Sequence, residues 1–244
     1  TKHMTLVSGT YYCNCGYAIN AKYYKGDSQI ERWVGIMPEE NGDFKEVIDN
    51  LQDEVKNNKK RGRKKVNKLK GLRCYLAGPI DAADDDGVGW RKDATKWLKA
   101  KGVKVLDPCD KPISYTAYKE IDIEKQKMME LKDNGRYFEL SQRMREIAHV
   151  DLRMTDISDF LIVYLNPNIT MFGTIHELIN SLNQKKPTLV VVEGGKGVAP
   201  NWLFGIMDFN FIFDSFEELY DFLGLIDTEA IQANLSRWVF FDNL

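Results

Sequence analysis

The sequence predicts an α/β fold in which helices cover both faces of a mostly parallel β-sheet. Short apolar runs that suit buried strands alternate along the chain with longer segments whose apolar residues recur at helical spacing. The expected strands are 72–78, 103–106, 159–165, 187–192 and a short fifth run, 209–213. The expected helices are 89–101, 115–158 with an interruption at Asn134-Gly135, and 174–184. Parallel sheets of this kind bind ligands at the carboxyl ends of their strands, so residues that follow the strands carry the functional information.

Each element has its own signal. The first run, LRCYLAG at 72–78, is apolar and ends in glycine before Pro79, as a buried strand does. In 89–101 four apolar residues share one helical face: Trp90, Ala94, Trp97 and Leu98. Asp107-Pro108 ends the second run, and the third, DFLIVYL, follows the long helical segment.

The chain is expected to divide into a small N-terminal α+β appendage, residues 1–68, and a main domain, residues 69–244. Residues 56–73 contain ten basic side chains and no acidic one, a composition typical of a solvated linker. Before this basic run, aromatic and β-branched residues punctuated by glycine predict a hairpin or small sheet, and 44–55 has helical spacing.

The composition excludes several classes of protein. A formal net charge of −2 gives no general reason to bind nucleic acid or a membrane surface. No apolar run approaches the roughly 18 residues of a membrane-spanning helix. The four cysteines, Cys13, Cys15, Cys74 and Cys109, form neither a four-ligand zinc pattern nor a secreted disulfide framework. We therefore expect a cytoplasmic protein without a metal or other cofactor.

The segment after the third strand, NPNITMFGTIHEL at 166–178, permits two interpretations. Thr174 and Glu177 have the spacing of a capping box, in which both side chains bind backbone amides at a helix start. Alternatively, a helix that begins at the carboxyl end of a buried strand places Glu177 in the crevice, near the positive end of the helix dipole. An ionised, positioned carboxylate of this kind can attack a sugar carbon.

Three other residues have both a structural and a chemical interpretation. Asp151 and Asp159 lie eight residues apart, and each taken alone is more typical of a solvated helix or a strand entry than of catalysis. Tyr75 on the first strand is typical of a core residue whose hydroxyl needs a partner.

Taken together and in order, these segments resemble the nucleoside 2-deoxyribosyltransferase family over roughly residues 73–214. The matching segments are Tyr75-Leu-Ala-Gly-Pro-Ile80, Gly89-Trp90-Arg91, Val105-Leu-Asp-Pro108, Asp151 with Ser158-Asp159, Gly173-Thr174-x-x-Glu177, and Ala199-Pro-Asn-Trp202.

The resemblance implies a flavodoxin-like fold and a covalent mechanism. Glu177 matches the family nucleophile, Asp151 the carboxyl group that handles the proton on the base, and Tyr75 the tyrosine that orients the nucleophile. The residues expected to contact substrate are Gly78, Pro79, Asp81, Trp90, Asp159, Gly173 and Asn201. The implied partners are a nucleoside and a free nucleobase, and the family implies a homo-oligomer whose active sites are shared, with Asn201 lent to a neighbouring subunit.

The sequence departs from the family at one position. Several members have an aspartate six residues before the nucleophile that helps to hold the sugar, and here that residue is Met171. Asn166, Asn168 and Thr170 are candidate substitutes.

Two alternatives remain beside base exchange. The first is a nucleoside 5′-monophosphate N-glycosidase of the same superfamily. The acidic loop 81–86 argues against it, because four aspartates near the sugar 5′ end would repel a phosphate. The second is a non-catalytic nucleotide- or nucleic-acid-binding module that uses the basic run, although this run lacks the interleaved aromatic residues that stack on single strands.

Overall fold

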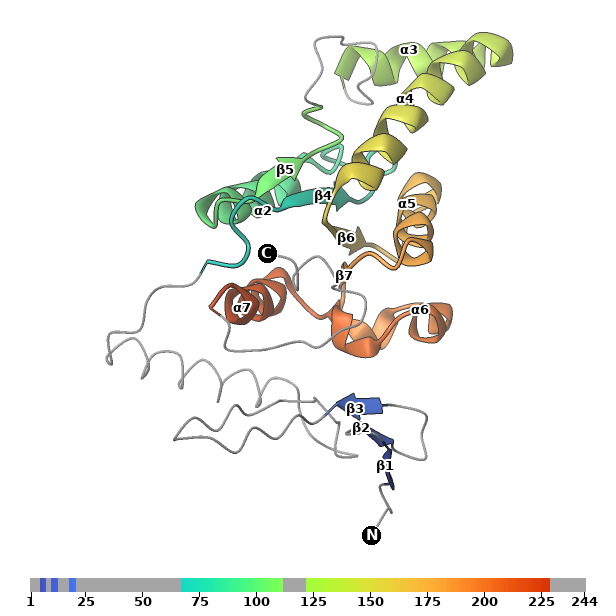
Figure 1. Ribbon diagram of the computed structural model, residues 1–244. Coiled ribbons are helices and arrows are strands. Elements are labelled where there is room, and N and C mark those ends of the chain that lie inside the picture. Colours follow the sequence, from blue (N-terminus) through green and yellow to red (C-terminus); the bar gives the residue numbers. More distant parts are fainter. Residues whose placement is uncertain (1–4, 8–9, 13–17, 21–66, 112–121, 229–244) are drawn as a thin grey trace. The chain divides into compact units, whose positions relative to one another are not determined.

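We analysed a computed structural model that describes residues 5–7, 10–12, 18–20, 67–111 and 122–228 (Figure 1). The chain divides into two compact units, one of Asn67–Gly224 and one of Thr1–Val66 with Leu225–Leu244. The division predicted from the sequence, 1–68 and 69–244, stays a prediction. In the first unit along the chain, three short strands form an antiparallel sheet in the order β1-β2-β3: Thr5–Val7, Thr10–Tyr12 and Ala18–Asn20. The predicted helix at 44–55 lies outside the described residues.

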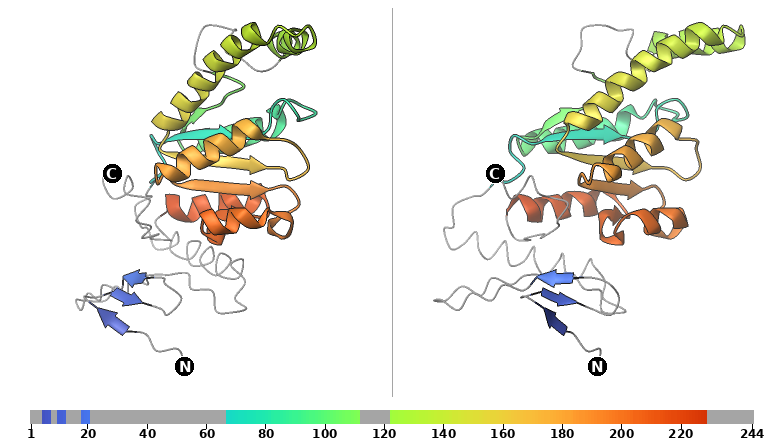
Figure 2. Two further views of the ribbon diagram at one scale, coloured as in Figure 1. Left: turned by 90° about the vertical axis from the view of Figure 1, so that its right-hand side faces the viewer. Right: turned by 45° about the vertical axis from the view of Figure 1, so that its right-hand side comes forward.

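The larger unit is built on a five-stranded parallel sheet. Its strands are β4 Arg73–Ala77, β5 Lys104–Leu106, β6 Phe160–Leu165, β7 Thr188–Val192 and β8 Ile212–Phe213. Their spatial order is β5-β4-β6-β7-β8 and every pairing is parallel. The arrows of the central strands β4, β6 and β7 point the same way in Figure 2. This strand order is the 2-1-3-4-5 order of flavodoxin-like sheets, in which the chain reverses its direction of winding between the first and third strands. The reversal here lies between β4 and β6.

Helices cover both faces of this sheet. The helices of this unit are α2 Val88–Ala100, α3 Asp122–Asp133, α4 Tyr137–Ile157, α5 Phe172–Asn183, α6 Asn201–Ile206 and α7 Phe216–Asp227. Of these, α3 packs against α4 and lies away from the sheet (Figure 1). Figure 1 shows α2 and α7 on one face, where Trp97 and Tyr220 stack at 4.8 Å, and α5 with the last turns of α4 on the other. The predicted α/β class with helices on both faces is confirmed.

The central strands are almost completely buried, as the apolar runs indicate. Phe160, Leu161, Ile162 and Val163 of β6 have no exposed surface, and neither do Leu189 and Val190 of β7. This burial is expected of a parallel sheet covered on both sides.

The predicted interruption of the long helical segment is found at Gly135, between α3 and α4, where its φ of 67° lies in the left-handed region that favours glycine. Other parts of the structure differ from the prediction. Residues 209–211 form a 3₁₀ turn rather than a strand, because the Asp208 carboxylate accepts a hydrogen bond from the amide of Asn210 and caps that turn. The helices α6 and α7 have no counterpart among the elements expected from the sequence.

Candidate active site

The central feature of the site is a hydrogen bond between two residues 102 positions apart. The Tyr75 hydroxyl donates to Glu177 Oε1 at 2.6 Å. Tyr75 lies in β4, where it pairs in register with Leu106 of β5 and Leu161 of β6, and Glu177 lies in α5, the helix that follows β6. The pair therefore joins β4 to α5 at the point where the sheet reverses its winding.

Tyr75 acts as the donor because its hydroxyl keeps its proton. The side chain has no exposed surface, and burial raises the pKa of Tyr75 well above its ordinary value. The charges of Glu177 and Asp151 raise this pKa further, because a phenolate would be repelled by both carboxylates. One oxygen of the half-buried Glu177 is thereby held in a fixed direction, as a nucleophilic carboxylate requires.

The capping-box interpretation of Thr174 and Glu177 is wrong. Helix α5 begins at Phe172, its cap residue is Met171, and no side chain caps its first turn. Thr174 is the third residue of the helix and is buried, and Glu177 lies in the second turn. The helix dipole therefore stabilises the Glu177 carboxylate less than the sequence predicts, since its effect fades beyond the first turn. Its observed partner is the tyrosine.

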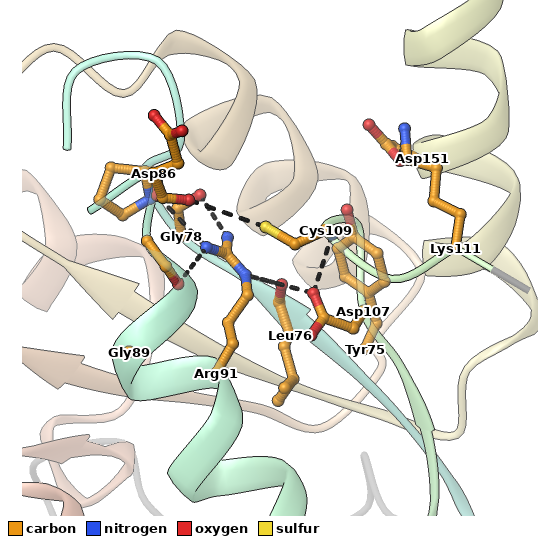
Figure 3. Close-up of polar contacts among 12 residues, drawn as sticks. Tyr75, Leu76, Gly78, Asp86, Gly89, Arg91, Asp107, Cys109, Lys111 and Asp151 are labelled. Carbon is orange, nitrogen blue, oxygen red and sulfur yellow. Dashed lines mark hydrogen bonds and ion pairs between the residues drawn. The ribbon is translucent and has the colours of Figure 1, made fainter. Parts of the chain in front are cut away.

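Asp151 forms an ion pair with a lysine that the sequence analysis did not single out. Lys111 Nζ lies 2.8 Å from Asp151 Oδ1, and the exposed fractions of the two side chains are 0% and 8%. Asp151 belongs to α4, and Lys111 follows the carboxyl end of β5 (Figure 3). Helices α4 and α5 both contact β4, and Asp151 acts electrostatically on the Tyr75 hydroxyl. Tyr75, Glu177, Asp151 and Lys111 thus converge on one face of the sheet.

A buried arginine organises the loop after β4. The Arg91 guanidinium donates to four backbone oxygens: Leu76 at 3.4 Å, Gly78 at 2.7 Å, Pro79 at 3.3 Å and Gly87 at 2.9 Å (Figure 3). Its Nε also lies 3.7 Å from Asp107 Oδ1. Because the side chain is 1% exposed, these contacts take the place of water around its charge.

Trp90 packs closely under the same loop. A Cβ atom on Gly78 would lie 2.6 Å from the Trp90 ring, so only glycine fits there. The ring stacks on Phe216 at 5.5 Å and also contacts Tyr164. Trp90 therefore packs directly against the backbone of Gly78. This packing role is structural, and the structure assigns Trp90 no contact with substrate.

The acidic loop 81–86 repels an anion less strongly than its four aspartates indicate. Asp85 accepts hydrogen bonds from the amides of Gly87 and Gly89 at 2.9 and 2.8 Å, and the bond from Gly89 is the largest cause that lowers the pKa of Asp85. Asp86 is paired with Lys125 of α3. Asp81 and Asp84 are exposed. Two of the four charges thus already have partners within the protein.

Asp159 does not join the Tyr75–Glu177 pair. It precedes β6 and binds the backbone amide and the guanidinium of Arg73, the first residue of β4, at 2.7 and 2.9 Å. Both residues lie at the amino ends of their strands, opposite the Gly78 end. Burial alone would raise the pKa of Asp159, but its bonds to Arg73 lower it below the ordinary value.

The remaining predicted residues lie around the carboxyl ends of the strands. Gly173 is in the first turn of α5, and Asn201 is exposed as the first residue of α6. Met171 packs against the core, and its sulfur accepts a hydrogen bond from the amide of Asn166. The Asn166 side-chain oxygen accepts from the amide of Asn168, so the turn itself uses that oxygen.

Within the part of the chain that the structure describes, no group of three or more His, Cys, Asp or Glu side chains is placed to hold a metal ion. In the same residues, none of the helices has both the length and the apolar character needed to cross a bilayer. Cys13 and Cys15 lie outside the described residues.

No protein-family model matches the sequence, and neither does any curated protein. Among solved structures, a 2-deoxyribosyltransferase from Bacillus psychrosaccharolyticus is 14% identical with a TM-score of 0.42, over 61% of this chain and 90% of that chain. A 2-desoxiribosyltransferase from Leishmania mexicana is 19% identical with a TM-score of 0.40, over 67% and 99%. A Clostridium botulinum CMP N-glycosidase is 14% identical with a TM-score of 0.36, over 63% and 98%. These similarities add nothing beyond the α/β fold already described.

Proposed function

We propose that this chain is a nucleoside 2-deoxyribosyltransferase that moves deoxyribose between nucleobases through a covalent glycosyl-Glu177 intermediate. The observation that carries the proposal is the 2.6 Å hydrogen bond from a fully buried tyrosine to a half-buried carboxylate beside the winding reversal of the sheet. A nucleophilic carboxylate has to be oriented in this way, which favours an enzyme over a binding module. The sequence resemblance described above supports the same assignment.

The residues of the site suit the two halves of such a reaction. As the base departs, the sugar carbon develops oxocarbenium character, and the carboxylate of Glu177 captures it as an ester. Tyr75 fixes the direction of that carboxylate and remains a neutral donor. Asp151 is the group proposed to exchange a proton with the departing and the arriving base. Two displacements at the same carbon restore the original configuration.

The rest of the proposal concerns the sugar and the assembly. With Met171 packed against the core, we propose that the sugar hydroxyls are held by Asn168, Thr170 or backbone groups rather than by a carboxylate. We further propose a homo-oligomer in which the exposed Asn201 completes a neighbouring site.

The test is incubation of the full chain with a deoxynucleoside and a second free base, with chromatography of the products. We expect the second nucleoside to appear, and intact-protein mass spectrometry to show a deoxyribosyl adduct on Glu177. Glu177→Gln keeps the shape and an acceptor for Tyr75 but removes the nucleophilic charge, and it should abolish both signals. Glu139→Gln, on the exposed start of α4, is the matched control. Undiminished turnover by folded Glu177→Gln protein would refute the assignment of the nucleophile.

The second candidate, a nucleoside 5′-monophosphate N-glycosidase, is favoured by one observation. Asp85 is engaged by amides and Asp86 by Lys125, which reduces the repulsion that the loop offers to a phosphate. Under our proposal, kcat/KM is higher for deoxynucleosides than for their monophosphates, and Asp84→Asn narrows the difference. Monophosphate preference, with free base and sugar phosphate as the products even in excess acceptor base, would move the protein to the hydrolase.

A further inference from the structure

Lys111 is the most deeply buried amine that the structure places beside this site. It lies five residues beyond the end of β5, and its side chain has no exposed surface. Lys111 Nζ lies 2.8 Å from Asp151 Oδ1. In Figure 3 this pair lies between the Tyr75 ring and helix α4. This arrangement is unlike that of a surface lysine, whose charged end stays in water while only its stem is buried.

Stability alone does not explain such a pair. Removing two charges from water costs several kcal/mol per ion, and apolar residues of similar volume are often as stabilising or more so. Asp151 and Lys111 join α4 to the loop after β5, where apolar contacts would hold the two elements equally well. The charges are therefore better explained by what they do next to Tyr75 and Glu177.

The pair also balances negative charge near the Tyr75 hydroxyl. Burial raises the pKa of the Tyr75 hydroxyl most, and the negative charges of Glu177 and Asp151 add to the effect. Two negative charges therefore act on one buried hydroxyl, in surroundings where charges interact more strongly than in water. The ammonium of Lys111 offsets the negative charge of Asp151, and it places a donor of protons against a carboxylate that is only 8% exposed.

We propose that Lys111 supplies, through Asp151, the proton that the departing base needs, an inference that rests on the proposed function. An N–H bond of the ammonium breaks and an O–H bond forms on Asp151. That proton then moves to a heteroatom of the base as the glycosidic C–N bond breaks and leaves its electron pair on nitrogen. The sugar carbon bonds to Glu177, and the sum of the charges is unchanged. The arriving base returns its proton along the same route.

In this scheme Lys111 touches no reacting atom, so it is a positioning residue that acts through Asp151. Two substitutions distinguish the effect of the positive charge of Lys111 from its ability to donate a proton. Lys111→Met removes both, whereas Lys111→Arg keeps a cation beside Asp151 that does not give up a proton near neutral pH.

The experiment measures kcat and KM of the full chain for deoxynucleosides whose bases range from poor to good leaving groups. We expect Lys111→Met and Lys111→Arg to lower kcat about 10²-fold for poor leaving groups, the usual size of a general-acid contribution, and far less for good ones. KM should change little. The control is Lys127→Met, which breaks an ion pair with Glu124 on α3 and should leave kcat unchanged.

A double-mutant cycle with Asp151→Asn tests the coupling. Lys111→Met alone leaves the buried carboxylate of Asp151 without its cation, which destabilises the fold. The double variant contains neither charge, so we expect it to be more stable than Lys111→Met. If Lys111 acts through Asp151, adding Lys111→Met to Asp151→Asn costs little further activity.

Three results would overturn the inference while leaving the proposed function in place. They are wild-type kcat in Lys111→Met, restored turnover of poor leaving groups in Lys111→Arg, and fully additive losses in the cycle. If the wild-type chain cleaves no N-glycoside at all, the proposed function fails and the inference fails with it.

Discussion

Substitution of Tyr75 by phenylalanine tests the central hydrogen bond independently of any substrate. The change removes one hydroxyl from a fully buried side chain and leaves the ring in place. A hydrogen bond to a charged acceptor contributes roughly 1.5–3 kcal/mol, and water can replace part of it because Glu177 is half-buried. We therefore expect Tyr75→Phe to lower the free energy of unfolding at pH 7 by about 1–1.5 kcal/mol, less than the full contribution of such a bond.

The same substitution should have the opposite effect in alkali. Because the pKa of Tyr75 is raised in the folded protein, the unfolded chain loses this proton first, from pH about 10 upward. The stability of the wild type then falls by up to about 1.4 kcal/mol per pH unit from this one group. Tyr75→Phe lacks that loss, so the two stability curves should cross roughly one pH unit above 10.

Urea unfolding followed by tryptophan fluorescence, between pH 7 and 11, measures both effects. Tyr137→Phe, which alters an exposed tyrosine on α4, is the control and should follow the wild type throughout. Parallel curves for wild type and Tyr75→Phe across this range would show that Tyr75 is not a buried donor to a carboxylate.

Two further predictions concern packing and acid stability. Gly78→Ala should lower the free energy of unfolding by about 1–3 kcal/mol, because its Cβ would meet the packed Trp90 ring at 2.6 Å. The control is Gly224→Ala in α7, where a Cβ meets nothing within 4 Å. In the same urea titration this control should be neutral or stabilising. Asp159→Asn should lower thermal stability at pH 7, and this difference should vanish as the pH falls below the lowered pKa of Asp159, because the bonds to Arg73 stabilise only the ionised carboxylate. A thermal melt of the variant that matches the wild type at neutral pH would contradict this account of the Arg73 contact.

The fold could be predicted because its signals are local. The buried strands are continuous apolar runs, and the break between α3 and α4 coincides with a glycine at positive φ. Helix α5 shows the limit of such signals. A threonine and a glutamate three residues apart form a known start signal, yet the helix begins two residues earlier, at Phe172, and Glu177 is held by a tyrosine 102 positions away.

Sequence reasoning missed the roles that depend on partners far away in the chain. Arg91 lies in a helix between Trp90 and Lys92, where an exposed cation is the ordinary expectation, and only the folded loop brings four carbonyl groups to it. Lys111 and Asp151 are forty positions apart, and no spacing rule connects them. Asp159 shows the opposite error. The family resemblance places it near the substrate, but it binds Arg73 at the amino ends of the strands.

The guanidinium of Arg91 has a consequence for engineering this protein. It binds Gly78 and Pro79 at one end of the loop and Gly87 at the other, so the base of the loop is closed by a single side chain. Residues 81–84 between these anchor points, three of which are exposed, can then be exchanged, lengthened or randomised as a cassette while Asp85 and Asp86 keep their contacts and the two ends stay in register with β4 and α2. A library confined to this cassette would vary the surface beyond the carboxyl end of β4 while preserving the Tyr75–Glu177 pair.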